Sequence, residues 1–243
     1  MSKEMFNLDR VIRSYDQRFA LEVESLRINK GDRLVLVGPS GSGKSTLLRL
    51  LNFLEQPTSG SIRFEGNSYS REKMPPLSET RKVTTVFQSP LLMSMSVLDN
   101  VCWGLKLRKM EHPEGNAMEA LEMVGMAAFA GKHVRSLSSG EAQRVALARA
   151  IVLSTDVLLL DEPTANLDPY NVSLIESIVR KLNQEKGTTI VMVTHNVFQA
   201  HRLGTQAALL LDGRIVEQAP VEKFFTHPED TRTSAFTRGE MVY

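Results

Sequence analysis

The chain has 243 residues, of which 42% are hydrophobic, and its 29 Lys and Arg nearly balance its 28 Asp and Glu, for a formal net charge of +1. This length is enough for one large domain with an ample core, and the balanced charge argues against a surface that binds nucleic acid or anionic membranes. No apolar run approaches the roughly 20 residues of a membrane-spanning helix, and the single Cys102 excludes an internal disulfide and indicates a reducing compartment.

The first 30 residues predict paired strands rather than a helix. Phe19, Leu21 and Val23 alternate with polar residues, so we expect a small antiparallel layer in this region. Tyr15 lies in a polar stretch there, and an ordinary half-exposed strand aromatic is as compatible with the sequence as a binding residue. Residues 1–6 lack the apolar core of a signal peptide, which leads us to expect a soluble, cytosolic protein.

A P-loop pattern, G-x-x-x-x-G-K-[ST], follows the short apolar run at residues 33–37. The matching residues are Gly38-Pro39-Ser40-Gly41-Ser42-Gly43-Lys44-Ser45-Thr46. Glycines let a tight loop direct its N–H groups at an anion, Lys44 would lie between the β- and γ-phosphates, and the Ser45 hydroxyl would bind Mg²⁺. Leucines at helical spacing from Lys44 to Leu54 place a helix N-terminus directly after the loop. This segment therefore predicts a nucleotide-phosphate site.

Two further strands are expected after the P-loop helix. They span residues 61–66 and 83–87, and the second ends at Gln88. The polar stretch between them, residues 67–82, contains Pro75-Pro76 and predicts an exposed loop.

The pattern is helical from Ser89 to about Ala150 and is rich in methionine. The methionines of this region are Met93, Met95, Met110, Met118, Met123 and Met126. Methionine packs adaptably and suits a lobe that moves or docks, but ordinary helix packing explains the composition equally well.

The segment Leu137-Ser138-Ser139-Gly140-Glu141 precedes an expected helix and has two interpretations. Ser138 or Ser139 would cap the helix, or the segment would form a second anion-binding nest at the helix N-terminus. Since one P-loop already accounts for the phosphates, a second nest is explained by a two-fold dimer in which it contacts the partner's nucleotide.

Two continuous apolar runs carry polar residues at their ends. Val157 to Leu160 is followed by Asp161 and Glu162, and Thr189 to Val193 is followed shortly by His195. Such runs indicate strands buried on both faces, hence a parallel sheet between helices, and ligands bind beyond the carboxyl ends of such strands. We expect Asp161 to bind Mg²⁺, Glu162 to polarise the attacking water, and His195 to contact the γ-phosphate.

The C-terminal part predicts three simpler features. An amphipathic helix at residues 172–182 is closed by Gly187, and residues 207–216 form a hairpin about a tight turn. The tail from Thr226 onward is polar and is expected to bury little.

These motifs, in this order, resemble those of the nucleotide-binding subunits of ATP-binding cassette (ABC) transporters over nearly the whole chain. Residues 38–46 look like the Walker A motif, residues 157–162 like Walker B with its catalytic glutamate, and residues 137–141 like the family signature. The resemblance implies an α/β P-loop NTPase fold with a mostly parallel sheet between helices, an N-terminal antiparallel β subdomain and an inserted α-helical subdomain.

The same resemblance implies domain boundaries and further site residues. Residues 1–88 and 151–243 would form a RecA-like core with its antiparallel layer, and residues 89–150 the helical subdomain. Gln88 looks like the Q-loop glutamine that contacts Mg²⁺ and links the two parts, and Tyr15 matches the aromatic that stacks on adenine.

The resemblance also implies that two copies of the chain share each ATP. Asp168, in Ala165-Asn166-Leu167-Asp168, looks like the D-loop aspartate, and His195 looks like the switch histidine. The expected contacts to the partner's ATP are Ser138, Ser139, Gly140, Glu141 and Asp168. The signature departs from the family in Ser139, where glycine is usual, and in Glu141, where glutamine is usual.

The implied function is an ATP- and Mg²⁺-dependent ATPase that forms a homodimer around two ATP and drives a membrane permease from the inner face of the cell membrane. The tail, with Phe224 to Pro228, Arg232-Thr233 and Phe236, is similar to that of cassettes serving oxyanions or polar amino acids, and the closing Arg238 to Met241 favours an oxyanion. We favour an oxyanion such as tungstate, molybdate or phosphate, with a polar amino acid as the alternative, and expect a solute-binding protein in the same system.

Two other classes of protein contain P-loops or related cassettes. A soluble P-loop kinase for a small metabolite would need an acceptor pocket and a lid, and would leave residues 137–141 unexplained. A non-transport ABC ATPase acting on DNA or the ribosome usually carries coiled-coil insertions or tandem cassettes, for which 243 residues leave no room. We therefore expect no nucleic-acid partner.

Overall fold

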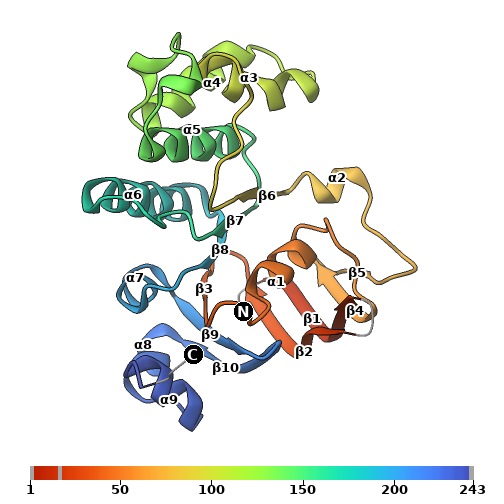
Figure 1. Cartoon of the computed structure of the whole chain (residues 1–243). Coiled ribbons are helices and arrows are strands. Elements are labelled where there is room, and N and C mark those ends of the chain that lie inside the picture. The colour runs from red at the N-terminus through yellow and green to blue at the C-terminus, as the bar shows by residue number, and fades with distance from the viewer. Residues whose placement is uncertain (1–2, 16–17, 241–243) are drawn as a thin grey trace.

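The computed structural model describes residues 3–15 and 18–240. Met241, part of the C-terminal segment considered above, lies outside the described residues. Within them, one ten-stranded mixed sheet runs through the molecule in the order β5-β4-β1-β2-β10-β9-β3-β8-β7-β6 (Figure 1).

The N-terminal half of the sheet is antiparallel, as the alternating pattern predicts. Its strands are β1 (Glu4–Tyr15), β2 (Arg18–Asn29), β4 (Ser59–Phe64) and β5 (Asn67–Tyr69). Apolar residues at alternate positions point to one face, where Phe6, Phe53, Phe64 and Tyr69 form an aromatic cluster.

The other half contains the buried parallel strands. They are β3 (Arg33–Val37), β6 (Val83–Val86), β7 (Val157–Asp161), β8 (Thr189–Val193) and β9 (Gln206–Leu211). The strand β10 (Arg214–Pro220) pairs with β9 in the predicted hairpin. Helices cover both faces of these strands, and the strands are therefore continuously apolar in sequence rather than alternating.

The helices beside the sheet include α1 (Lys44–Leu51), α6 (Pro169–Lys186) and α7 (Val197–Leu203). Of these, α1 and α6 were predicted, and α7 follows His195 where no helix was predicted. α1 is shorter than predicted, because the helix ends at Asn52 and Leu54 is 68% exposed. α6 ends at Gly187, as predicted, in a left-handed conformation with φ 66° that glycine adopts without strain.

The helical region forms a separate lobe above the sheet in Figure 1. It comprises α3 (Val97–Leu107), α4 (Pro113–Met123), α5 (Ser139–Ile151) and the short 3₁₀ turns η1 (Ala127–Phe129) and η2 (Val134–Ser136). Met126 is fully buried, and Met118 and Met123 pack against the same core. For these three methionines, ordinary helix packing is the correct interpretation.

Two segments contain more structure than the sequence predicts. Residues 67–82 include β5 and the helix α2 (Leu77–Thr80), and Tyr69 is only 5% exposed. The tail forms α8 (Val221–Thr226) and α9 (Thr231–Thr237), with Phe236 only 8% exposed. Both segments are too short and too polar for their periodicity to be visible.

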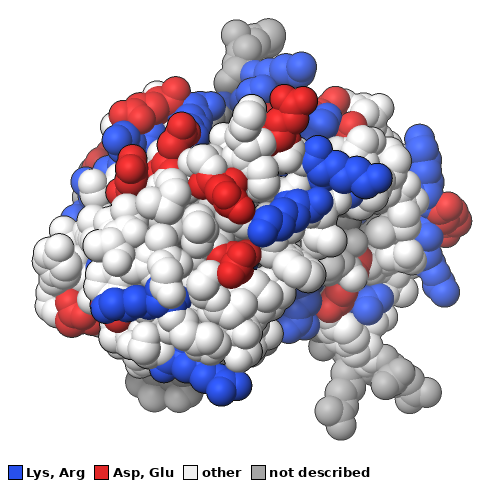
Figure 2. All heavy atoms as spheres, turned by 90° about the horizontal axis from the view of Figure 1, so that it is seen from above, with Lys and Arg blue, Asp and Glu red and all other residues white. Residues whose placement is uncertain are grey.

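Across residues 3–15 and 18–240, none of the helices has the length and apolar character needed to cross a membrane. On the face seen in Figure 2, Lys and Arg are interspersed with Asp and Glu and separated by uncharged areas. This view agrees with the near-zero net charge of the sequence.

Candidate nucleotide-binding site

The parallel strands bring most of the predicted site residues to one cleft. β3, β8 and β7 are adjacent, with Leu36 beside Val193 and Val193 beside Asp161, so their carboxyl ends lie together. Beyond them lies a cleft of about 280 Å³. Its lining residues are Ser40, Gly41, Gly43, Lys44, Ser45, Thr46, Arg49, Glu162 and His195.

The P-loop is held in shape by glycine and by a backbone contact from the turn that follows the neighbouring strand β9. Gly38 has φ 143°, and a Cβ there would lie 2.1 Å from the carbonyl oxygen of Leu210, so no other residue fits. The carbonyl of Ser42 accepts a hydrogen bond of 3.0 Å from the N–H of Gly213 in the β9–β10 turn. Gly38 and Ser42 are buried and form the base of the loop rather than the cleft wall.

Lys44 is oriented by acceptors of the loop itself. Its ammonium donates to the carbonyl oxygens of Gly38 at 2.8 Å and Pro39 at 2.6 Å, and lies 3.4 Å from the Ser42 hydroxyl. Burial lowers the pKa of Lys44, while the negative charges of Glu162 and Asp161 oppose that shift. Lys44 is thus held against the P-loop backbone at the cleft, which Arg49 also lines.

Glu162 and His195 contact each other across the cleft. Nε2 of His195 lies 2.5 Å from Oε1 of Glu162. Glu162 has a left-handed backbone with φ 46°, which is uncommon for a residue other than glycine and which occurs at functional sites. Its N–H donates to the carbonyl of Val193 at 3.1 Å, which ties the turn after β7 to β8. The two residues predicted to act on the attacking water and the γ-phosphate therefore form one unit.

The oxygen donors present suit Mg²⁺. The Ser45 hydroxyl lines the cleft, and the half-buried Asp161 directly precedes Glu162. Among the described residues, no group of three or more His, Cys, Asp or Glu could form a protein metal cage. Mg²⁺ takes one or two protein oxygens together with phosphate oxygens and water, and a hydroxyl and a carboxylate are oxygen ligands of this kind. Of the three expected ligands, Ser45 lines the cleft, whereas Asp161 and the exposed Gln88 do not.

The signature segment lies away from this cleft and begins α5 with a capping box. The Ser138 hydroxyl accepts from the N–H of Glu141 at 3.3 Å, and the Glu141 carboxylate accepts from the N–H of Ser138 at 2.8 Å. These bonds lower the pKa of Glu141. The capping interpretation is confirmed, while Ser138 and Ser139 remain exposed for a partner.

Asp168 is joined to the signature helix through a residue that no sequence motif indicates. Its carboxylate caps α6 by accepting from the N–H of Asn171 at 3.0 Å and from the side-chain amide of Asn171 at 2.5 Å, bonds that lower its pKa. Asn171 in turn accepts from Nη1 of Arg144 in α5 at 2.7 Å. A Cβ on Gly140 would lie 2.6 Å from the Asn171 side chain, so glycine permits this contact.

Tyr15 lies outside the lining of the cleft and is 37% exposed. Its hydroxyl donates to Glu55, and the guanidinium of Arg13 lies 4.6 Å from the ring centroid. The contact with adenine stays a prediction.

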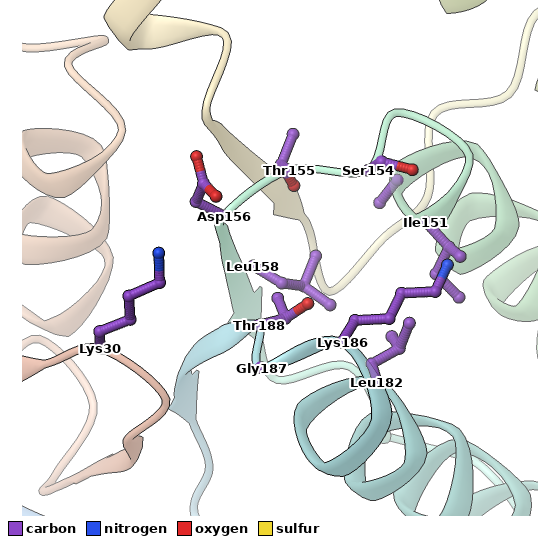
Figure 3. Close-up of a pocket in the computed structure, with 11 residues that line it drawn as sticks. Lys30, Ile151, Ser154, Thr155, Asp156, Leu158, Leu182, Lys186, Gly187 and Thr188 are labelled. Atoms are coloured by element: carbon purple, nitrogen blue, oxygen red, sulfur yellow. The ribbon is translucent and has the colours of Figure 1, made fainter.

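A second cavity, of about 260 Å³, opens at the opposite edge of the parallel strands (Figure 3). It is lined in part by Lys30, Asp156 and Thr188, and by Ile151 and Lys186 at the C-terminal ends of α5 and α6. Helix C-termini carry partial negative charge and disfavour phosphate. None of the predicted site residues lies there, so the P-loop cleft is the nucleotide candidate.

Comparisons with known proteins agree with this geometry. A family model described as ABC transporter matches residues 21–165. The chain is 38% identical over 245 residues to the phosphate import ATP-binding protein PstB 2 of Natronomonas pharaonis, covering 96% of this chain and 86% of that protein. The names of other relatives specify methionine, iron(III) ions or glutamate.

Two solved structures share the fold over most of their length. The dimeric, post-hydrolysis structure of the ATP-binding cassette MJ0796 with ADP and phosphate superposes with a TM-score of 0.80 at 31% identity, covering 89% of this chain and 99% of that one. The structure of cbiO1 from Clostridium perfringens, part of the transporter complex cbiONQ, gives a TM-score of 0.84 at 29% identity and covers 96% of this chain and 95% of that one.

Proposed function

The chain belongs to the ABC transporter family as an ATPase subunit, and from that premise we propose that two copies enclose two ATP molecules and drive a membrane permease in the import of an oxyanion. The observation that carries the proposal is the convergence of Lys44, Glu162 and His195 on one cleft. The match to the ABC transporter family, which extends from the antiparallel layer through the P-loop to residue 165, argues against a metabolite kinase.

Lys44, Glu162 and His195 each have a proposed role in phosphoryl transfer to water. Lys44 holds the β- and γ-phosphates, and Glu162 accepts a hydrogen bond from the attacking water and polarises it. His195 keeps the Glu162 carboxylate directed at that water through Nε2 and contacts the γ-phosphate. Mg²⁺, when held by Ser45 and Asp161, supplies positive charge beside the phosphates.

The second half of each site is proposed to come from the partner copy. The exposed Ser138 and Ser139 at the start of α5 offer hydroxyl donors and a helix N-terminus to a γ-phosphate. The dimeric state of the similar cassette MJ0796 supports this arrangement. Asp168 is exposed on the same chain and is joined to α5 through Asn171, which suits a role at the dimer contact.

The proposed permease contact is a groove of about 360 Å³ between the edge strand β6 and the helical lobe. Its lining includes Phe87, Leu91, Met93 and Trp103, of which Phe87 and Trp103 are each 45% exposed and Leu91 is 82% exposed. An apolar groove of this kind accepts the apolar face of a short helix. The groove begins beside Gln88, so a docked helix would lie next to the proposed link to the nucleotide. This contact would hold the chain at the cytoplasmic side of the cell membrane.

The proposed cargo rests on relatives rather than on the site. Relatives named for phosphate and for anion import, both 38% identical to this chain, support an oxyanion. A solute-binding protein in the same system stays a prediction. A relative named for glutamate transport, 39% identical over 96% of the chain, favours a polar amino acid as the second candidate.

Uptake measurements test both the function and the cargo. Cells that lack this chain are compared with cells that carry it or its Glu162→Gln variant, using labelled phosphate, molybdate, tungstate and glutamate. We expect uptake of one oxyanion to require the wild-type chain. Loss of glutamate uptake alone selects the second candidate, and unchanged uptake of all four solutes argues against both cargoes.

A further inference from the structure

We propose that Gln199, a buried residue of α7, is a positioning residue that holds Glu162 and His195 in contact. The inference rests on the proposed roles of these two residues in ATP hydrolysis. Gln199 is 1% exposed and does not line the nucleotide cleft, so it acts through its neighbours.

One side-chain amide joins the two loops that carry the catalytic pair. The amide oxygen of Gln199 accepts a hydrogen bond of 2.7 Å from the hydroxyl of Thr194, which directly precedes His195. The amide nitrogen lies 3.0 Å from the hydroxyl of Thr164, two residues after Glu162. A shift of either loop therefore changes a bond to the same amide.

The orientation of this amide follows from a buried carboxylate. Nε2 of Gln199 lies 3.1 Å from Oε1 of Glu176 in α6, and an ionised carboxylate only accepts hydrogen bonds. The nitrogen must therefore point to Glu176, which leaves the oxygen for Thr194. Glu176 is 5% exposed and is paired with Arg202 at 2.6 Å and with Arg180 at 3.7 Å.

Backbone hydrogen bonds at the start of α7 fix the turn that contains Thr194 and Asn196. The N–H of Gln199 donates to the Asn196 side chain at 2.9 Å, and the N–H of Asn196 donates to the Thr194 hydroxyl at 3.1 Å. Thr194 is 4% exposed, and its hydroxyl thus accepts one bond and donates another. The turn that carries His195 is held on both sides, and buried polar networks whose groups are all bonded are rigid.

Gln199→Met tests the proposal, because methionine keeps the length of the side chain and removes the bonds to Thr164 and Thr194, together with the bond to Glu176. Misplacing catalytic groups by about 1 Å costs up to about 100-fold in rate. We expect kcat for ATP hydrolysis to fall roughly 10- to 100-fold, with ATP affinity nearly unchanged because Gln199 does not contact the P-loop. The matched control is Gln184→Met, at an exposed position of α6, and should behave as wild type.

Thermal melting of each variant, with rates measured well below its Tm, separates positioning from unfolding. If Gln199→Met does not fold, Thr194→Val removes one of the two contacts, and Thr194→Ser, which keeps the hydroxyl, should recover most of the lost kcat. Wild-type kcat in the folded Gln199→Met protein overturns the proposal, and so does a matching fall in kcat and ATP affinity. A wild-type chain that hydrolyses no ATP in the same assay contradicts the proposed function instead.

Discussion

The imidazole of His195 and the carboxylate of Glu162 lie 2.5 Å apart because the neighbouring strands β7 and β8 end at the same edge of the sheet. Glu162 follows Asp161, the last residue of β7, whereas His195 stands two residues beyond β8. The left-handed backbone of Glu162 turns its chain at this point. The pair therefore depends on sheet register, on one uncommon backbone conformation and on the turn after β8.

Glu162→Gln should stop ATP turnover while ATP binding persists. The amide has the shape of the carboxylate but accepts no proton and polarises water weakly, which should lower kcat by at least about 100-fold. ATP with Mg²⁺ should then drive the variant into a stable dimer, measured by size-exclusion chromatography. A protein that remains monomeric while ATP is bound would contradict the proposed sandwich of two nucleotides.

Lys44→Ala should abolish hydrolysis and weaken nucleotide binding, because it removes the cation held at the phosphate end of the cleft. Turnover and the binding of a fluorescent ATP analogue are the measurements. Arg49→Ala is a useful comparison, since Arg49 lines the same cleft but is paired with Glu55 at 3.4 Å, and we expect a smaller effect. Wild-type turnover in Lys44→Ala would rule out the phosphate role.

Much of the fold was predictable because the strands have clear periods. Alternation before residue 30 predicted the antiparallel layer, and the apolar runs ending at Leu160 and Val193 predicted the central parallel strands. The helix α9 was missed because it buries only Thr233 and Phe236, too few positions to show a helical period. The helix α1 was predicted too long because Leu54 continues the leucine spacing beyond the point where the chain turns at Phe53.

The cleft was predictable from motifs, but the residues that support it were not. Lys44, Glu162 and His195 follow from the P-loop and from the rule that ligands bind at the carboxyl ends of strands. Asn171 and Gln199 carry no motif, and each acts through contacts with residues distant in sequence, such as Arg144 and Thr164. A sequence alone does not specify which helices lie close enough for such bonds.

Tyr15→Ala should weaken ATP binding if the ring stacks on adenine. We expect a loss of roughly 10-fold, equivalent to about 1.4 kcal/mol, which lies within the range of aromatic stacking on bases. Tyr15→Phe removes the hydrogen bond to Glu55 but keeps the ring, so its affinity should stay near wild type. Equal losses in the two variants, measured by nucleotide titration, would assign the effect to the Glu55 contact.

A cysteine at Met93 should crosslink to the permease in native membranes once Cys102 has been replaced. Met93 lines the apolar groove beside β6, whereas Cys102 is buried and its burial raises the pKa of the thiol. A cysteine at the exposed Lys73, in the segment of residues 67–82, is the matched control. Crosslinks from Lys73 alone would move the docking surface to that segment.

Ser138→Arg should block hydrolysis by filling the space offered to the partner's phosphate, while ATP still binds to the intact P-loop. Ser138 also caps α5, so Ser138→Ala is the control that removes the cap, at a cost of about 1 kcal/mol, without adding bulk. Wild-type hydrolysis by Ser138→Arg would leave the segment at residues 137–141 with a capping role alone.

A mixed dimer of Ser138→Arg and Lys44→Ala should recover activity that neither variant has alone. In a two-fold dimer, one site combines both defects, and the other pairs an intact Lys44 with an intact Ser138. Random mixing produces about half heterodimers, so purification by two different tags should enrich the active species. Recovered turnover in that fraction demonstrates a shared site. The Ser138→Arg chain, whose P-loop is intact, should still bind ATP in these heterodimers. If verified heterodimers then show no turnover, either each chain completes its own site or both sites must be intact for either to act. A heterodimer of wild type and Ser138→Arg distinguishes the two. It should hydrolyse ATP if each chain completes its own site, because the wild-type chain is intact. It should be inactive if both shared sites must be intact, because one of them contains the arginine.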